Sequence, residues 1–362
     1  MSSRRPHPKS RSGCQRCKEK HIKCDEAWPV CGACARYNVP CVAKAAKPAK
    51  PAESQAPPSG STAARSTVTL WEFELLHHWI LRVSDSFDVS PGFHNLWREH
   101  MVRDALRHDF ILHMILILSA LHLALTKSPL FTEAHRSFIL EGCSGATTRF
   151  RQEAQNICDS NCHAVGAFPY LLAMYAMALP HLDREEKGDD AVVDEMIHIL
   201  ALIKGYSLVQ DSTNSWIRTR GLVPWAEDTD LMDPDSSLDQ ELTRALDTLP
   251  PWIDASDDEP AVRACNLMTV NAFKKILEFH VKPNLRPFPW PNAVSSDYLE
   301  LLRRRNPMAM VILAHYAVIL GQCSSQWWCA NWGVRLISVV ASILPEKYAG
   351  AIAWPCQMLM RW

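Results

Sequence analysis

Six cysteines lie within 28 residues near the start of the chain, at a spacing that two metal ions could use. A C-x2-C unit binds zinc from one tight turn, and structural zinc takes four ligands in a tetrahedron. The unit C-x2-C-x6-C occurs twice with a shift of 17 residues, so each repeat supplies three thiolates. Two Zn²⁺ need eight ligand positions from six sulfurs, and two cysteines must therefore bridge. The symmetry of the repeat assigns bridging to Cys14 and Cys31 among the ligands Cys14, Cys17, Cys24, Cys31, Cys34 and Cys41.

The other seven of the 13 cysteines are scattered between Cys143 and Cys356. The first residues contain no apolar segment of the kind that directs secretion, so we expect reduced thiols. Six cysteines without zinc, or one zinc with spare thiols, are the alternatives, and the faithful repetition of both spacers argues against them. Metal binding should supply the folding free energy of so small a unit, on the order of 10 kcal/mol.

The two repeats differ in charge. The second repeat has only one basic residue, Arg36, whereas the first is rich in them. Residues 1–50 carry 12 Lys and Arg against 3 acidic residues, and the remainder carries 26 against 36. A short basic helix beside a metal site can enter the DNA major groove, where cations contact phosphates and guanine edges. The predicted contacts to double-stranded DNA are Arg11, Arg16, Lys18, Lys20, His21 and Lys23.

Composition predicts four segments. They are a basic disordered arm at 1–10, the zinc cluster at 11–43, a flexible Ala/Pro/Lys-rich linker at 44–67 and an apolar-rich domain at 68–362. A linker of this length has a relaxed span of roughly 25 to 30 Å. Because 48% of the residues are hydrophobic, the last segment can bury a sizeable core.

Helical patterns dominate the last segment, and we expect it to be all-α. Thr69 and Glu72 form a predicted capping box, and Asn306 with Pro307 begins a run that we expect to end at Gly321. Other helices are expected at 131–155, 165–180, 191–206, 261–279 and 333–344. The longest apolar run that we identify, 110–125, is shorter than a membrane span requires, so we expect a buried helix and no span.

The run CQRCKEKHIKCDEAWPVCGACARYNVPC resembles the fungal binuclear zinc cluster of six-cysteine transcription factors. The resemblance implies bridging by the first and fourth cysteines, two Zn²⁺ and recognition of a short CGG-like, GC-rich half-site. By position, Lys20 and His21 fall where the family's base-contacting pair lies, and Lys18 and Lys23 fall on phosphate partners. His21 stands where Lys or Arg is more usual.

Within this family, the chain is more closely similar to the sterol uptake control branch. The similarity rests on KHIKCDE, LWEFELLHHW, ILHMILILSALHLAL and NPMAMVILAHYAVIL, followed by Trp327, Trp328 and Trp332. It implies an all-α regulatory domain that can hold an apolar small-molecule effector such as a sterol, in a family that also controls secondary-metabolite genes. Taken alone, the tryptophans together with Met308 and Met310 are assigned to the core.

These features predict a nuclear, sequence-specific regulator of RNA polymerase II transcription that acts with the transcription machinery. An enzyme is disfavoured because G-x-S-x-G, H-E-x-x-H and P-loop motifs do not occur. The alternative function is a zinc-dependent protein interaction module without DNA specificity, which would not need the basic first repeat. Four prolines between positions 48 and 58 exclude a coiled coil there, which leaves a monomer or a dimer through the helical domain.

Overall fold

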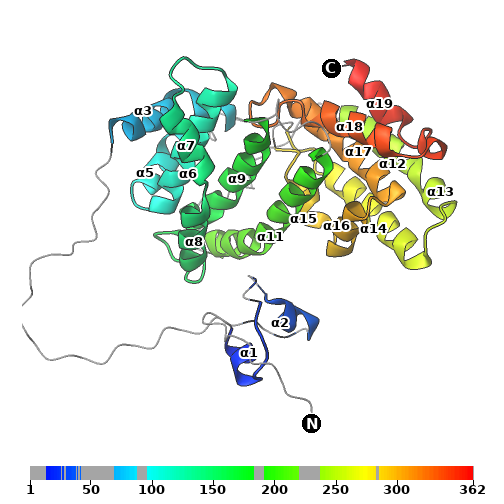
Figure 1. Cartoon of the computed structure of the whole chain (residues 1–362), viewed down its shortest axis with the longest axis horizontal. Helices are drawn as coiled ribbons and strands as arrows, with labels where there is room; N and C mark the ends of the chain where they lie inside the picture. Colours follow the sequence, from blue (N-terminus) through cyan, green and yellow to red (C-terminus); the bar gives the residue numbers. More distant parts are fainter. Residues whose placement is uncertain are drawn as a thin grey trace, which may run out of the picture. The chain divides into compact units, whose positions relative to one another are not determined.

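The computed structural model describes residues 14–25, 27, 30–37, 39, 41, 69–87, 96–182, 191–219, 237–282 and 285–361. The chain divides into two compact units, residues 1–65 and 66–362, which are described separately here (Figure 1). The predicted arm and the predicted linker lie outside the described residues, as does Arg11.

The first unit contains two short helices that repeat one another. Helix α1 spans Gln15–Glu19 and helix α2 spans Gly32–Arg36. A cysteine caps each of them at its N-terminus. The buried cluster of this unit consists of five cysteines, with Ala33, Val39 and Cys41 packed against it. So little buried apolar surface cannot stabilise a folded domain by itself. Domains of this size are usually stabilised by a bound metal that cross-links their segments.

The second unit is a body of helices, and no strand occurs among the residues described in it (Figure 1). Its first half contains α3 (Leu70–His78), η1 (Trp79–Val83), η2 (Ser84–Phe87), η3 (Leu96–His100), α5 (Met101–Ala105), α6 (Asp109–Leu125), α7 (Glu133–Glu141), α8 (Ser144–Glu153), α9 (Cys162–Ala178), η4 (Leu179–His181) and α11 (Val192–Thr219). Its second half contains α12 (Ser237–Asp247), α13 (Leu249–Asp254), α14 (Pro260–Leu277), α15 (Pro289–Ala293), α16 (Ser296–Arg303), α17 (Pro307–Gln322), η6 (Cys323–Ser325), α18 (Trp332–Ile343), η7 (Glu346–Tyr348), α19 (Ala353–Met358) and η8 (Leu359–Arg361).

Helix α11 joins the two halves of the body. It packs against α9 of the first half and against α15, α16 and α18 of the second (Figure 1). Helix α6 lies at the centre of the first half, where it contacts α3, α5, α7, α8 and α9. Helix α17 has the same role in the second half, where α18 is its main neighbour. One continuous apolar core results.

Helices α9 and α17 are apolar on all sides. Two segments, 162–181 and 307–325, are long and apolar enough to cross a membrane by length and composition. Sequence analysis identified only the shorter run at 110–125. In the body, 78% of the first segment's most apolar window and 83% of the second's are buried inside the protein. They therefore fold here as core helices, which are hydrophobic all round when buried.

Several local predictions can be compared with the body directly. The backbone N–H of Thr69 donates to the Glu72 carboxylate at 2.6 Å, as the capping box predicts. Asn306 caps α17 by accepting the Ala309 N–H at 3.0 Å. The helix then runs one residue beyond Gly321. The single helix expected at 131–155 is two helices, α7 and α8, which are separated at Gly142, where φ is +73°.

Candidate metal centre and nucleic-acid interface

The first unit brings the six cysteines into two groups of four. Within each group the Sγ atoms all lie within 4.8 Å of one another. Cys14 and Cys31 belong to both groups, Cys17 and Cys24 complete the first, and Cys34 and Cys41 complete the second. Each group is therefore one tetrahedral ligand set, and the two sets share two sulfurs.

The distances between sulfurs fit zinc. A tetrahedron with Zn–S bonds of about 2.3 Å has edges of about 3.8 Å between its sulfurs. The Sγ atoms of Cys14 and Cys31 are 3.8 Å apart, those of Cys14 and Cys34 are 3.6 Å apart, and those of Cys17 and Cys31 are 3.6 Å apart. Two zinc ions could be held at these positions with little rearrangement of the side chains.

The two shared cysteines also occupy equivalent positions on the helices. The Cys14 sulfur accepts the Cys17 N–H at 3.5 Å, and the Cys31 sulfur accepts the Cys34 N–H at 3.4 Å. These backbone hydrogen bonds lower the pKa of both Cys14 and Cys31, which favours their thiolates. Burial has the opposite effect on the next cysteine of each repeat, and it raises the pKa of Cys34 to about 12. A bound Zn²⁺ overrides such a shift because it deprotonates a coordinating thiol.

Helix α1 ends in a Schellman motif that fixes His21. The His21 N–H donates to the Lys18 carbonyl at 3.3 Å, and the Ile22 N–H donates to the Cys17 carbonyl at 3.0 Å. His21 itself has φ of +51°, the left-handed conformation that this motif requires at its position. The second repeat has the matching bond from the Val39 N–H to the Cys34 carbonyl, at 3.2 Å. The left-handed backbone conformation therefore restricts which residue type fits at position 21, in addition to any restriction from a contact with DNA.

The predicted DNA contacts lie on α1 and the turn that follows it. Lys20, His21 and Lys23 are exposed, while Arg16 and Lys18 are half-buried. Arg11 lies outside the described residues. On α2 the exposed cation is Arg36. The difference in charge between the repeats is thus a difference between two short helices that flank one metal centre.

Asp25 lies in the run that carries the family resemblance, but its sequence position alone assigned it no role. The Asp25 carboxylate accepts the N–H of Gly32, the first residue of α2, with its Oδ2 at 2.9 Å. The available signal was an aspartate directly after the third cysteine together with a glycine directly after the fourth.

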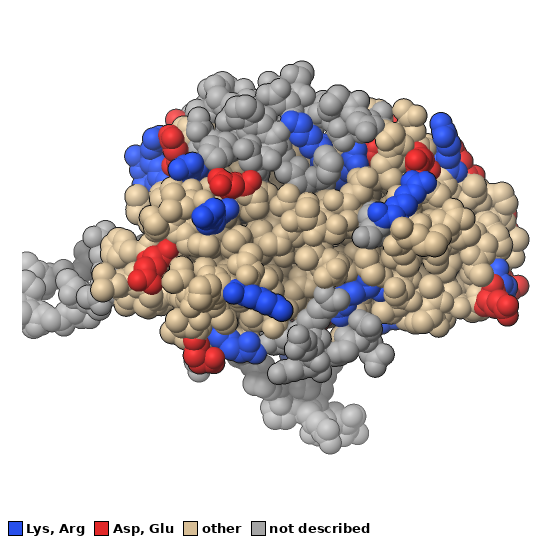
Figure 2. All heavy atoms as spheres, turned by 90° about the horizontal axis from the view of Figure 1, so that it is seen from above, with Lys and Arg blue, Asp and Glu red and all other residues tan. Residues whose placement is uncertain are grey.

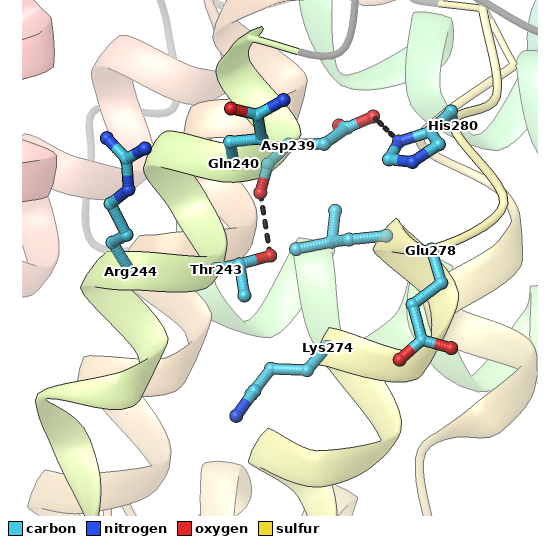
Figure 3. A pocket seen from close by; sticks show the side chains of 8 residues that line it. Asp239, Gln240, Thr243, Arg244, Lys274, Glu278 and His280 are labelled. Carbon is cyan, nitrogen blue, oxygen red and sulfur yellow. Dashed lines mark hydrogen bonds and ion pairs between the residues drawn. The ribbon is translucent and has the colours of Figure 1, made fainter.

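The second unit has a hollow of about 360 Å³ between α12 and α14 (Figure 3). Asp239 is buried there, where its Oδ2 receives His280 Nδ1 at 3.2 Å and Arg286 at 3.4 Å. Apart from Leu277, the residues that line the hollow carry charged or polar groups. The lining consists of Asp239, Gln240, Thr243, Arg244, Lys274, Leu277, Glu278 and His280.

Figure 2 shows one face of the helical body, where Lys and Arg side chains are interspersed with Asp and Glu. No extended area of one charge is present among the described residues on that face. A DNA-binding surface is expected to be strongly positive. This face therefore lacks the charge pattern that α1 and its following turn display.

Comparisons with known proteins divide the chain in a similar way. The model of the fungal Zn(2)-Cys(6) binuclear cluster domain matches residues 12–50, and that of the fungal specific transcription factor domain matches residues 74–162.

Two curated relatives are similar over most of their length. The Zn(2)-C6 fungal-type transcription factor afumD of Aspergillus fumigatus is 28% identical over 348 residues, which cover 87% of this chain and 86% of the relative. A Zn(2)-C6 fungal-type transcription factor of Gibberella zeae is 23% identical over 439 residues, which cover 99% of this chain and 87% of that relative. Sterol uptake control protein 2 of Candida albicans is 50% identical over 38 residues, which is 10% of this chain and 5% of that protein.

Proposed function

We propose that the chain is a DNA-binding transcription regulator of the fungal Zn(2)-Cys(6) family and not an enzyme, and that its first repeat is the part that reads DNA. The supporting observation is the charge of the two helices. Helix α1 and its following turn carry five of the predicted contacts, whereas α2 offers Arg36. The second repeat then serves mainly to complete the metal centre.

The cluster binds two zinc ions, and we assign a ligand set to each. Cys17 and Cys24 hold one ion and Cys34 and Cys41 hold the other, while Cys14 and Cys31 bridge both. Membership of both four-sulfur groups and the N–H donor to each sulfur support this bridging pair. When bound, zinc cross-links the two repeats and takes the place of an apolar core. The protein's own contribution is to direct six sulfurs inward from two capped helices.

Within the first repeat, we assign base contacts to Lys20 and His21 and phosphate contacts to Arg16, Lys18 and Lys23. Arg11, at the start of the cluster segment, adds a further phosphate contact. Lysine pairs with the O6 and N7 atoms of guanine in the major groove, which fits a short GC-rich half-site. Because each phosphate contact releases counterions, the observed binding constant should fall steeply with salt.

The test is selection of bound sequences from a random DNA pool by the zinc-loaded full chain. We expect a short GC-rich word that the Lys20→Glu variant no longer recovers. The matched control is Arg36→Glu, which makes the same charge change on the exposed face of α2 and should recover the same word. Loss of the word in both variants would assign binding to overall charge. No word with two zinc ions bound would favour the protein interaction module instead.

The same selection tests the oligomeric state. A single half-site would indicate a monomer. An inverted repeat would indicate a dimer formed through the helical body, and the Ala/Pro/Lys-rich composition of residues 44–67 predicts a loose spacing between its half-sites. Proteins of this family are generally nuclear, and we place this chain in the nucleus. Imaging of the tagged full chain in fungal cells checks that placement.

An apolar effector is the second proposal for the helical body. The indole N–H groups of Trp290 and Trp328 are buried and have no hydrogen-bond acceptor among the described residues. Trp290 lies in an aromatic cluster with Phe273 and Tyr316. An apolar molecule with one oxygen acceptor would satisfy such a group. A sterol should raise the melting temperature of the full chain, and should do so less in Trp290→Phe; no shift in either protein would exclude sterols.

We propose sterol or secondary-metabolite genes as the targets. The similarity of the 38-residue segment to sterol uptake control protein 2 supports the first class. Comparison of transcripts between the natural strain and a strain with Cys14→Ala would decide between the two classes. Unchanged transcripts of both would refute the proposal.

A further inference from the structure

The carboxylate of Asp25 connects the two repeats of the cluster. Its Oδ2 lies 2.9 Å from the backbone nitrogen of Gly32, and its Oδ1 lies 3.2 Å from the same atom. The Oδ1 atom also accepts the N–H of Ala27 at 3.3 Å. Asp25 directly follows the last cysteine of the first repeat, and Gly32 is the first residue of α2. The contact therefore closes the loop between the repeats.

Gly32 allows this close approach because it has no side chain. A Cβ atom at position 32 would lie 2.6 Å from Asp25 Oδ2, which is closer than real Cβ atoms come to a neighbour. The equivalent residue of the first repeat, 17 positions earlier, is Gln15, and the equivalent of Asp25 is Val42. The internal repeat thus has this aspartate and glycine pair once, directed from the first repeat to the second.

The contact completes the N-terminus of α2. The first N–H groups of a helix have no partners within the helix. Here the Cys31 N–H donates to Cys41 Sγ at 3.4 Å, the Cys34 N–H donates to Cys31 Sγ at 3.4 Å, and the Gly32 N–H donates to Asp25 Oδ2 at 2.9 Å. A carboxylate at this end of a helix is favoured by charge and accepts a stronger hydrogen bond than a neutral group. Asp25 therefore holds the helix that presents Cys31 and Cys34.

We propose that Asp25 is a positioning residue for DNA binding. It anchors the end of the segment that carries Lys23 to the second repeat, and so fixes how the basic turn after α1 is presented. This inference rests on the proposed DNA contact of the first repeat. Asp25 touches neither DNA nor metal in this role, since its carboxylate is occupied by backbone N–H groups.

The sign of the effect separates positioning from charge. Loss of a negative charge near DNA phosphates should by charge alone tighten binding. Loss of a charged hydrogen bond that orients the basic turn should weaken binding by about tenfold. Asp25→Ala in the full chain is therefore expected to bind a duplex with the selected word about tenfold more weakly, while it still holds two zinc ions. Glu19→Ala is the matched control, because Glu19 is an exposed acid on α1 that pairs with Gln15 within the helix. It should bind DNA as tightly as the natural chain or more tightly.

Two further measurements keep the test independent of folding. Selective labelling with ¹⁵N-glycine reports 13 amides, and the Gly32 signal should shift in Asp25→Ala and stay in place in Glu19→Ala. Gly32→Ala displaces the carboxylate by its new methyl group. Its effect on DNA binding should therefore not add to that of Asp25→Ala in the double variant.

Each outcome decides the matter. If the natural chain binds no DNA, the proposed function is refuted, and the positioning role of Asp25, which rests on it, is refuted with it. Natural chain that binds DNA, with Asp25→Ala equally tight or tighter, would overturn the positioning role. So would full additivity in the double variant. Loss of zinc from Asp25→Ala and Gly32→Ala in proportion to their loss of DNA binding would also overturn it, because the residue would then maintain the metal centre only.

Discussion

The zinc cluster and the helical body are stabilised by different physical interactions. In the cluster, five buried cysteines stand where a larger domain has apolar side chains, and its helices are five residues long. In the body, large side chains such as Trp79, Trp290, Trp328 and Trp332 are fully buried in one continuous core. The cluster depends on a few ligands whose loss nothing else compensates. The body distributes its stability over many contacts, each of which is a small part of the total.

This difference implies that the two units should fail separately. Removal of the metal should unfold the cluster and leave the body intact. Lesions in the core should destabilise the body and leave the DNA affinity of the folded fraction unchanged.

The largest effect should come from removal of zinc. A strong chelator should abolish DNA binding altogether, because metal binding supplies on the order of 10 kcal/mol to a unit of this kind. The helical circular dichroism of the body and its melting temperature should change little. Titration of the full chain with chelator, followed by both signals, measures this. Restoration of DNA binding by added Zn²⁺ is the control, and collapse of the body together with the cluster would contradict the separation.

The next largest effect should come from breaking a buried ion pair in the body. Asp239 and Arg286 have side chains only 3% and 5% exposed. Removal of one partner leaves a buried charge, so Asp239→Ala should lower the free energy of unfolding by about 3 to 5 kcal/mol. Urea unfolding of the full chain measures this, and binding to DNA below the transition should not change.

The matched control for the ion pair is Asp257→Ala. Asp257 pairs with Lys347 at 2.8 Å, but both side chains are largely exposed. Removal of an exposed pair should leave unfolding by urea nearly unchanged. Equal losses from Asp239→Ala and Asp257→Ala would show that burial does not determine the effect.

A substitution where two helices pack closely should cause a smaller loss of unfolding free energy. Gly333 of α18 lies against α17, where an added Cβ would meet the Ala317 carbonyl oxygen at 2.6 Å and the backbone of Gly321. Gly333→Ala should destabilise the body by about 1 to 3 kcal/mol, because neither helix backbone can move freely. Gly145→Ala on α8 is the control, since a Cβ there meets nothing within 4 Å. That variant should be neutral or slightly stabilising in the same thermal unfolding experiment.

These residues show what sequence could and could not predict. The metal centre was predictable because all its ligands lie within 28 residues and repeat with a fixed shift. Gly321 was interpreted as a helix end, yet α17 continues to Gln322 and the glycine permits close packing with α18. That role depends on a residue 12 positions away in another helix, which periodicity along one segment does not reveal.

The polar contacts of the body also depend on residues in other helices. His113 and His122 lie nine positions apart on α6, and both contact residues that are distant in the sequence. His113 Nε2 lies 3.0 Å from the carbonyl oxygen of Gly142, 29 residues later, and His122 Nδ1 lies 3.0 Å from Nε2 of His78, 44 residues earlier. Contacts of this kind are set by how α3 packs on α6. Spacing identified the helices, but the pairs between helices follow only from the packed core.

Acid should weaken the body through its buried histidines. Burial lowers the pKa of His315 and of His122 to about 4 each. Both are neutral in the folded chain, and in the unfolded chain they take up protons below about pH 6.5. The unfolded state then binds more protons, so stability is full above pH 6.5 and falls as the pH decreases towards 4. At pH 5 the loss should be about 2 kcal/mol for His315, and less for the partly exposed His122.

The measurement is the free energy of unfolding of the body against pH. His315→Phe retains a ring that can stack on Trp354 and removes the titrating group. This variant should flatten the pH dependence between pH 6.5 and 5. A slope identical to that of the natural chain would contradict the assignment.

The smallest effect concerns His21, where fold and recognition meet in one residue of the cluster. Its left-handed conformation costs a β-branched residue about 1 to 2 kcal/mol and costs glycine nothing. His21→Val should therefore release zinc to a chelator more readily than the natural chain, whereas His21→Gly should retain it. Both variants should change the DNA word, because both remove the imidazole. Equal zinc retention in the two variants would show that the Schellman motif does not constrain this position, and would leave base contact as the reason for the histidine.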